Sequence, residues 1–397
     1  MSALKLVPFA RNAIRLPVLL CGRNLGLLQS SRLMATMIGA PKKKSSTMRL
    51  LLTGAVIGGL VGGGYSAYNS IGKKKTSKDE LVSGVLDEKP EVPIMRRINN
   101  PDDNTGLELI LFQFQTCPFC CKVRSFLDYS GLSYSVVEVD AVLRQSIKWS
   151  SSKKVPTMLA RTRDGKYVQL NDSSVIISAL TSFLVDPKKS NIEDIVKFYP
   201  VQNFTDVYGT VFDIANKYFL MFQDKKPKES KEVFDEERQW RSWADNHLVH
   251  LISPNVYRSY AEARETFEWF SETGQWSSYF PAWERNLMVQ AGTLAMYLIS
   301  KRLTKKHGLG DDPRAHLYEA CDKWLSALDK KKTKFMGGDK EPNLADLSVY
   351  GILCSMEGCS AFKDCLENTR IGHWFYDVKA KVESNRGSRL PVSLYKV

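Results

Sequence analysis

The chain has 397 residues, enough for two domains and a targeting segment, and its 43% hydrophobic and 25% charged residues are typical of a globular protein. The formal net charge is +13, but nine basic residues fall within residues 1–49, which contain no Asp or Glu. The remainder of the chain is therefore only mildly basic, and we expect no nucleic-acid partner. Eight cysteines, mostly scattered, exclude a disulfide framework and favour a reducing compartment.

The first hundred residues divide into three segments. The acid-free, basic stretch 1–49 has the pattern of a targeting leader, although an unstructured basic tail would have the same composition. Residues 50–72 carry no charge and are long enough to cross a membrane as one helix, so we expect a single-span anchor, with a glycine-rich linker as the alternative. Residues 73–104 are charged and contain three prolines, which predicts a tether with little structure.

The next segment, Leu107 to Ser130, is a strand followed by a helix. A nearly continuous apolar run from Leu107 to Phe114 predicts a strand buried on both faces. Thr116 is placed to cap the following helix, and Pro118 fits its first turn, where a missing N–H costs nothing. The turn between strand and helix therefore holds the sequence Cys-Pro-Phe-Cys.

This arrangement puts Cys117 at a helix N-terminus and Cys120 one turn further along, where unpaired N–H groups favour a thiolate. Lys122 and Arg124 add positive charge. We interpret the pair as a redox or nucleophilic thiol site, with ordinary buried cysteines or half of a zinc site as alternatives. Cys121 lies about 100° around the helix from Cys120, and we expect it to pack in the core.

Residues 105–190 have the pattern of one α/β domain. A second strand is predicted over 133–140, a third starts at Val155-Pro156, and a turn at 163–166 leads to a fourth. Asp172 and Ser173 then open a helix, where both are good capping residues.

Residues 195–397 have helical periodicity from Glu236 almost to the end, and the stretch 227–235 is predicted to be a loop. We therefore expect an all-α domain. Asn343 and Asp346 have the spacing of a capping box at the start of a buried helix. His247 and His250 share a helical face but lack a further ligand, so we expect no metal site.

The order strand, CPFC, helix, strand, Val-Pro, hairpin, Asp-Ser, helix resembles the thioredoxin fold as glutaredoxins and glutathione transferases use it. This resemblance implies an α/β thioredoxin-like (glutaredoxin-like) N-terminal domain plus an all-α glutathione-transferase-like C-terminal domain, preceded by the single-span membrane anchor. It also implies a glutathione site, with the Val155 backbone holding the cysteinyl part and Asp172 and Ser173 holding the γ-glutamyl end.

Longer motifs resemble one family within that class, the membrane-associated, glutathione-transferase-like prostaglandin E synthases. They include QTCPFCCKVRSFLDY, KVPTM, QLNDSSVIISAL, WADNHLVHLISPNVYR, AMYLISKRL and FMGGDKEPNLADLSVYG. The resemblance implies a homodimeric isomerase that converts prostaglandin H2 to prostaglandin E2, with Cys117 as catalytic thiol and Cys120 beside it. Phe114 stands where relatives have a tyrosine, and its ring is expected to line a lipid pocket.

The same resemblance implies glutathione as a ligand, together with haem, in a form that degrades the endoperoxide. It places the protein in the Golgi membrane as a single-pass protein with its body facing the cytosol, and with a cleaved cytoplasmic form; the leader favours mitochondria as the alternative. Two other functions remain open on the same fold: a glutaredoxin-like or transferase-like thiol enzyme, and a non-enzymatic binder of glutathione and haem.

Overall fold

The computed structural model describes residues 78–81, 84–139, 144–206, 209–222, 224–227, 229–279 and 281–389. The basic leader and the anchor expected at 50–72 lie outside the described residues. Within the described part, no helix combines the length and the apolar character that crossing a bilayer requires.

A six-stranded mixed sheet forms the first layer, in the order β1-β6-β5-β3-β4-β2. Its strands are β1 (Val85–Leu86), β2 (Arg96–Ile98), β3 (Leu109–Gln113), β4 (Tyr134–Glu138), β5 (Thr157–Arg161) and β6 (Tyr167–Asn171). β3 runs parallel to β4 and antiparallel to β5, and all five residues of β3 are buried. The predicted thioredoxin-like arrangement, with the strand before CPFC at the centre, is confirmed.

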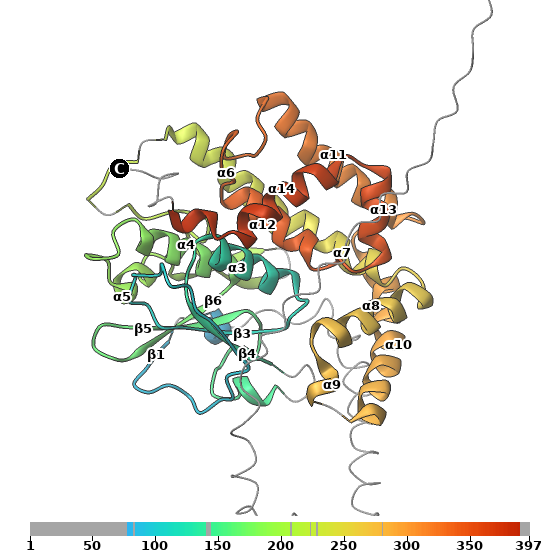
Figure 1. Ribbon diagram of the computed structural model, residues 1–397, viewed down its shortest axis with the longest axis horizontal. Coiled ribbons are helices and arrows are strands. Elements are labelled where there is room, and N and C mark those ends of the chain that lie inside the picture. Colours follow the sequence, from blue (N-terminus) through green and yellow to red (C-terminus); the bar gives the residue numbers. More distant parts are fainter. Residues whose placement is uncertain are drawn as a thin grey trace, which may run out of the picture. The chain divides into compact units, whose positions relative to one another are not determined.

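Two helices, α3 (Pro118–Tyr129) and α4 (Ser173–Leu184), cover one face of this sheet (Figure 1). Side chains alternate along a strand, so Leu109 and Leu111 join the large core that includes both helices, whereas Ile110 and Phe112 belong to a smaller cluster on the opposite face. Short helical segments complete this half: α2 (Lys78–Leu81), the 3₁₀ turn η1 (Gln145–Ile147) and α5 (Ile192–Val196).

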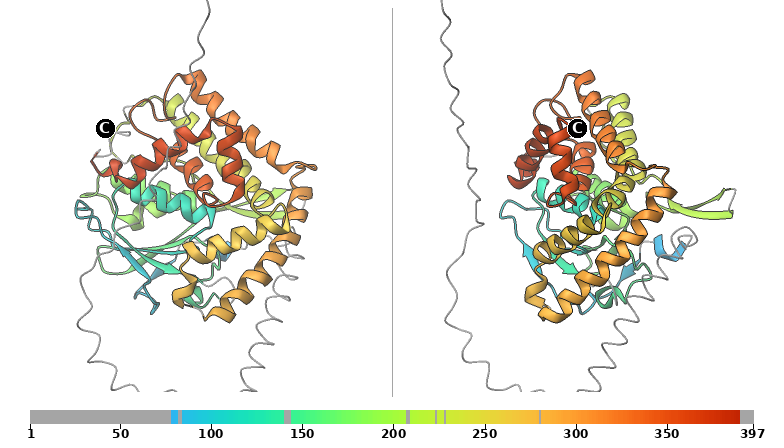
Figure 2. Two further views of the ribbon diagram at one scale, coloured as in Figure 1. Left: turned by 45° about the vertical axis from the view of Figure 1, so that its right-hand side comes forward. Right: turned by 90° about the vertical axis from the view of Figure 1, so that its right-hand side faces the viewer.

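Part of the segment expected to be a tether is instead folded onto the sheet. β1 pairs with β6 and β2 pairs with β4, so both strands lie at the edges. The prolines of this segment stand outside the two short strands, which removes the conflict between proline and a β-ladder. A two-stranded hairpin, β7 (Val201–Asp206) and β8 (Gly209–Ile214), was also not anticipated, and it projects from the body in Figure 2.

From Lys231 the described chain is mainly helical, as predicted. The helices are α6 (Lys231–Trp243), the π-helical turn η2 (Ala244–Leu248), α7 (Val249–Val256), α8 (Tyr260–Thr273), α9 (Trp276–Tyr279), α10 (Ala282–Lys306), α11 (Pro313–Lys331), α12 (Leu344–Cys354), α13 (Ser360–Asn368), α14 (Ile371–Glu383) and the 3₁₀ turn η3 (Arg386–Arg389). α6 begins at Lys231, within the stretch predicted to be a loop; lysine and glutamate are good helix formers, and Ser230 stands at the N-cap.

The start of α12 confirms the predicted capping box. The Asn343 side chain accepts hydrogen bonds from the backbone N–H groups of Ala345 and Asp346, and Asp346 accepts one from the Asn343 N–H at 3.0 Å. Asp346 also accepts from the Trp374 indole at 3.1 Å, so the box ties α12 to α14. Every residue from Leu344 to Leu353 is buried, which makes α12 the central helix of the second half.

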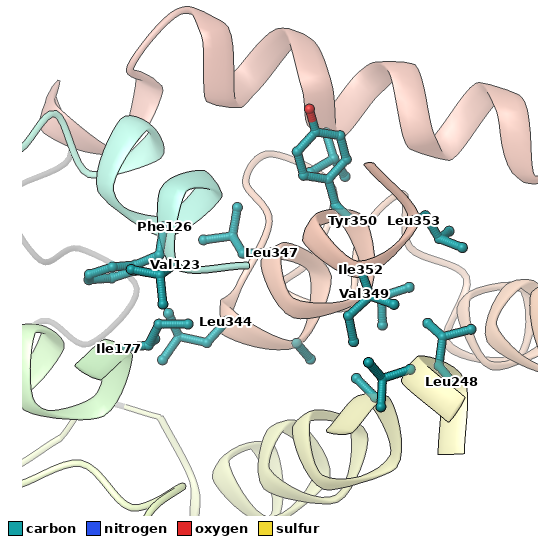
Figure 3. Packing of buried hydrophobic residues seen from close by; sticks show 14 of the residues in the cluster. Val123, Phe126, Ile177, Leu248, Leu344, Leu347, Val349, Tyr350, Ile352 and Leu353 are labelled. Atoms are coloured by element: carbon teal, nitrogen blue, oxygen red, sulfur yellow. The ribbon is translucent and has the colours of Figure 1, made fainter. Parts of the chain in front are cut away.

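Helix α12 packs directly on α3. A Cβ at Gly351 would lie 2.4 Å from the Cα of Lys122, so only glycine permits this approach of the two backbones. Leu344 and Leu347 of α12 point toward Val123 and Phe126 of α3 in Figure 3. One continuous apolar core therefore joins the sheet layer to the helical half and fixes their relative position around the Cys117 helix.

Candidate active site

The strand register brings the predicted site segments to the same end of the sheet. Thr157 of β5 pairs with Phe112 of β3 on one side and with Asn171 of β6 on the other. Cys117 follows Phe112 after a short turn, Val155 stands just before Thr157, and Asp172 follows Asn171 directly. The thiol turn, the Val-Pro segment and the start of α4 are therefore neighbours at this end of the sheet.

Cys117 is itself the N-cap of α3, and the expectation that Thr116 would cap the helix is wrong. The Cys117 N–H donates to the Phe114 carbonyl at 3.2 Å, which closes a turn and delays the helix by one residue. The Cys117 carbonyl then accepts the first helical bond, from the Cys121 N–H at 2.8 Å. Its half-buried thiol therefore lies at the positively polarised end of the helix.

The two thiols of the CPFC turn have opposite acid strengths. A hydrogen bond from the Cys120 thiol, supported by the backbone N–H groups of Cys120 and Phe119 and by the Arg124 charge, lowers the pKa of Cys117 to about 7 despite its burial. Burial and the neighbouring Cys117 thiol raise the pKa of Cys120. Near neutral pH, Cys117 is partly a thiolate while Cys120 stays a neutral hydrogen-bond donor. This is the pair of protonation states expected of a nucleophilic thiolate and the thiol that stabilises it.

Arg124 supplies the fixed positive charge of the site, as predicted. Its guanidinium donates to the Gln113 side chain at 2.5 Å, to the Gln115 carbonyl at 2.6 Å and to the Cys121 sulfur at 3.1 Å. These bonds hold the guanidinium against the end of β3, below the thiol turn. Cys121 is buried at 3% exposure and packs in the core, as expected. All seven cysteines in the described residues are free thiols.

The other predicted site residues have clear local positions. The Val155-Pro156 peptide bond is cis and leads into β5. Asp172 is the N-cap of α4, with its Oδ1 accepting from the N–H groups of Ser174 at 2.8 Å and Val175 at 3.3 Å. Its φ of 70° is in the left-handed region, which is costly for a residue with a Cβ and is often found at functional sites. Ser173 is buried in the first turn.

A buried polar cluster next to Asp172 was not predicted. Lys122, expected to add charge near the thiol, instead points to α4 and the helical half: its ammonium donates to the Ser174 hydroxyl at 2.9 Å and forms an ion pair with Asp245 in η2. Asp245 also accepts from Ser174 at 2.5 Å and from Tyr218 at 3.1 Å. No sequence signal links residues so far apart, although a π-helical turn such as η2 often marks a functional position.

The acid strengths of the two carboxyls reflect this cluster. Burial alone would raise the pKa of Asp245, but the Lys122 ammonium and the hydrogen bonds of Lys122 and Ser174 lower it. Burial, and then the negative charge of Asp245, raise the pKa of Asp172, which Lys122 and Lys217 partly offset. The cluster therefore connects the candidate glutathione residue Asp172 to both halves of the protein.

Tyr257, at the C-terminal end of α7, is a second residue that the sequence did not reveal. Burial raises its pKa, and negative charge on Cys359 and Cys117 adds to the effect, so this phenol stays protonated. Phe114 contributes differently: its ring packs partly buried against the smaller cluster on the sheet face away from α3. The described cavities do not include Cys117, so a lipid pocket lined by Phe114 stays a prediction.

Comparison with known proteins agrees with this geometry. Residues 109–162 match the family model for glutaredoxin. Prostaglandin E synthase 2 of Mus musculus is 46% identical over 284 residues, which cover 70% of this chain and 72% of that protein. Prostaglandin E synthase 2 of Danio rerio is 42% identical over 339 residues, covering 82% and 83%. Glutathione transferase F7 of Populus trichocarpa aligns over 70% of this chain and 99% of its own, with 14% identity and a TM-score of 0.39.

The fold and the thiol turn define a protein with a thioredoxin-fold domain, matched to glutaredoxin over residues 109–162, followed by a helical region. Identity above 40% over more than two thirds of both relatives is more specific than the fold. The chain belongs to the prostaglandin E synthase 2 family.

Proposed function

We propose that this chain converts prostaglandin H2 to prostaglandin E2, with the Cys117 thiolate as the nucleophile. The observation that carries the proposal is the half-buried thiol at the N-terminus of α3, whose pKa is lowered to about 7. It is supported by relatives whose printed name is prostaglandin E synthase 2. The polarised helix end and the neutral Cys120 thiol stabilise the thiolate form of Cys117, which makes it both a nucleophile and a leaving group near neutral pH.

The proposed chemistry is an isomerisation that consumes no redox equivalent. The thiolate attacks the endoperoxide oxygen on the ring carbon that becomes the ketone, an S–O bond forms, and the O–O bond breaks. The second oxygen leaves as an alkoxide and takes a proton to become the hydroxyl. Loss of the proton from the first ring carbon then forms the C=O bond, and the sulfur leaves as a thiolate.

Tyr257 is the candidate for both proton transfers. Its raised pKa keeps the phenol protonated, so it can give its proton to the alkoxide. The resulting phenolate is a strong base and can recover a proton from the ring carbon, which restores the starting state. In this proposal Tyr257 supplies the phenol that relatives of the resembled family carry at the position of Phe114.

A Cys117→Ser variant tests the proposal. We expect prostaglandin E2 formation, separated by mass spectrometry from spontaneous breakdown of the endoperoxide, to fall to the uncatalysed level. Cys121→Ser is the matched control, because Cys121 is in the same helix but packs in the core. Wild-type turnover by Cys117→Ser, with an unchanged thermal melting temperature, would overturn the proposed role of this sulfur.

Glutathione is the proposed thiol ligand of the same site. The Val155 backbone would hold its cysteinyl part, and Ser173 and the Oδ2 oxygen of Asp172 would hold its γ-glutamyl group at the start of α4, where helix N–H groups favour a carboxylate. Calorimetric titration with glutathione should give weaker binding for Asp172→Asn than for the wild type. Equal affinities of both proteins would remove Asp172 from the binding site.

A second activity is favoured by the unequal thiols of Cys117 and Cys120. Such a pair can attack glutathione disulfide through Cys117, which releases one glutathione, and resolve the mixed disulfide through Cys120, which releases the second. A dithiol reductant, oxidised in turn to its own disulfide, then returns the Cys117–Cys120 disulfide to two thiols. Reduction of glutathione disulfide that needs both cysteines, without any isomerisation of prostaglandin H2, would favour this glutaredoxin-like function over the isomerase.

The remaining expectations rest on the sequence pattern and the family resemblance. We propose that residues 50–72 anchor the chain in the Golgi membrane, with mitochondria as the alternative, and that the body forms a homodimer that also binds haem. No step of the chemistry above needs haem. Imaging the tagged full chain beside a chain lacking residues 1–72 separates the two membranes, and sedimentation of the purified protein measures the oligomeric state.

A further inference from the structure

A cavity of about 1140 Å³ lies at the end of α3 opposite to Cys117. The 12 residues of α3 separate the two places by about 18 Å along the helix axis. Its walls come from the loop before β3, the turn after α3, the β5–β6 hairpin, the segment after α4 and the start of α12. The cavity is therefore separate from the thiol site, and a ligand bound in one place need not occupy the other.

One wall of this cavity is apolar. Phe126 of α3 and Leu344 and Leu347 of α12 line it, and Figure 3 shows them at the contact between these two helices. Leu184, at the end of α4, lines the same cavity and is only partly buried. Phe126, Leu344 and Leu347 are at most 4% exposed and form the floor of the cavity, so among these four residues Leu184 offers most of the apolar surface for a hydrocarbon chain.

The edge formed by the β5–β6 hairpin is basic. The Arg163 guanidinium donates to the Lys188 carbonyl at 2.6 Å and to the Ser190 carbonyl at 3.1 Å, which holds it at the cavity and keeps Lys188 beside it. Both side chains are exposed, and none of the described carboxylates forms an ion pair with either. Arg161 adds a third charge and pairs with Glu108 at 3.4 Å, where both side chains are about half exposed.

The acidic groups of the lining are largely engaged elsewhere. Asp103 accepts from the Ser133 N–H at 2.6 Å and from Thr105 at 2.7 Å. Asp186 pairs with Lys225 at 3.4 Å, and Asp102 lies on the loop before β3 rather than on the hairpin. The Arg163 and Lys188 edge therefore keeps its positive charge next to the apolar wall.

The geometry points to a binding site for a free long-chain fatty acid, with its carboxylate on Arg163 and Lys188 and its alkyl chain along Leu184, over the floor formed by Phe126, Leu344 and Leu347. Arginine beside lysine favours a carboxylate through charge-assisted hydrogen bonds. The volume exceeds what one alkyl chain needs, so the chain can enter without displacing the core. This inference concerns a second site and does not depend on the proposed isomerase activity.

Photolabelling of the full chain tests the inference. The probe is a palmitic acid analogue with a diazirine near its methyl end, and the adducts are mapped by protease digestion and mass spectrometry. We expect adducts on peptides that contain Phe126, Leu184 or Leu344–Leu347, and we expect unlabelled palmitic acid to compete with them. The double variant Arg163→Glu and Lys188→Glu should reduce this labelling at least about tenfold, the effect of losing charge-assisted bonds.

Three controls make the outcome decisive. Arg264→Glu reverses an exposed charge on α8, away from the cavity, and should leave labelling unchanged. The methyl ester of the probe should label poorly, because it lacks the carboxylate. Cys117→Ser should label like the wild type, which separates this cavity from the thiol site. Adducts spread over exposed apolar residues, equal labelling by the ester, or full labelling of the charge-reversed variant would each overturn the proposal.

Discussion

The ammonium of Lys122 on α3 and the carboxylate of Asp245 in η2 form an ion pair in which the lysine side chain is fully buried. Ser174 of α4 bonds to both partners, so three elements of the two halves meet at one point. Breaking such a pair leaves an uncompensated charge inside the protein, which is more costly than the pair itself is stabilising. The contact therefore ties the start of α4, with Asp172, to the helical half.

Removal of one partner should be strongly destabilising. We expect Asp245→Asn to lower the free energy of unfolding by about 3–5 kcal/mol, measured by urea unfolding followed by tryptophan fluorescence. Asp329→Asn is the matched control: its pair with Arg370 is exposed, and its loss should cost less than about 1 kcal/mol. Equal stability of Asp245→Asn and wild type would show that the pair contributes nothing.

The same carboxyl predicts a pH dependence. The pKa of Asp245 is lowered in the folded protein, so its contribution to stability is present at neutral pH and is lost as the pH falls through that lowered value, below about pH 4. Unfolding measured as a function of pH should show a steeper loss of stability in acid for the wild type than for Asp245→Asn. Parallel curves for the two proteins would contradict the assignment.

The thiolate of Cys117 should be visible in its alkylation rate. With iodoacetamide, the rate for the wild type should rise with a midpoint near the pKa of about 7. Cys120→Ala removes the hydrogen bond that contributes most to the lowered pKa, and its midpoint should move up toward the ordinary thiol value of about 8.5. Cys121→Ala should keep the wild-type midpoint. A midpoint unaffected by Cys120→Ala would assign the effect to the helix N-terminus and Arg124 alone.

Tyr257→Phe tests the proposed proton donor without removing the ring that packs near Phe267. We expect kcat for prostaglandin E2 formation to fall by about 10²-fold or more, the usual contribution of general acid-base catalysis, with little change in KM. The alkylation midpoint of Cys117 in this variant reports whether the thiol is disturbed. An unchanged kcat would remove Tyr257 from the reaction.

The contact between α12 and α3 should not tolerate a methyl group. Gly351→Ala places a Cβ 2.4 Å from the Lys122 Cα, so one helix has to move, and we expect a loss of about 1–3 kcal/mol in unfolding free energy. Gly372→Ala, in α14, is the control, because its Cβ would meet only the end of the Leu366 side chain at 3.1 Å. Similar stabilities of both variants would contradict the close approach.

Local signals in the sequence predicted the parts of the structure that depend on neighbouring residues. The apolar run before CPFC predicted β3, and the spacing of Asn343 and Asp346 predicted the start of α12, because a cap and a buried strand need only nearby residues. The ion pair between Lys122 and Asp245 could not be predicted from the sequence, because the two residues are 123 positions apart and lysine and aspartate are common on protein surfaces. Tyr257 was missed for the same reason.

The edge strands β1 and β2 show another limit. They contain two and three residues, too few for an alternating pattern, and their pairing is decided by the exposed edges of β6 and β4. The predicted start of α6 is too late because lysine is not a specific signal for a loop: a solvated helix face carries lysine equally well.

The π-helical turn η2 joins α6 to α7 and sets which faces of these two helices point in the same direction. α6 carries Arg241, which donates to the Ser178 hydroxyl of α4 at 2.7 Å, and α7 ends beside Tyr257. Because a π-helical turn holds about one residue more than an α-helical turn, deleting one residue from 244–248 would let α6 and α7 keep nearly the same relative phase, but Asp245 would lose its place beside Lys122 and Ser174. The buried Lys122 ammonium would then lack its carboxylate, so a single-residue deletion here should disturb the start of α4, with Asp172, even where the overall fold survives.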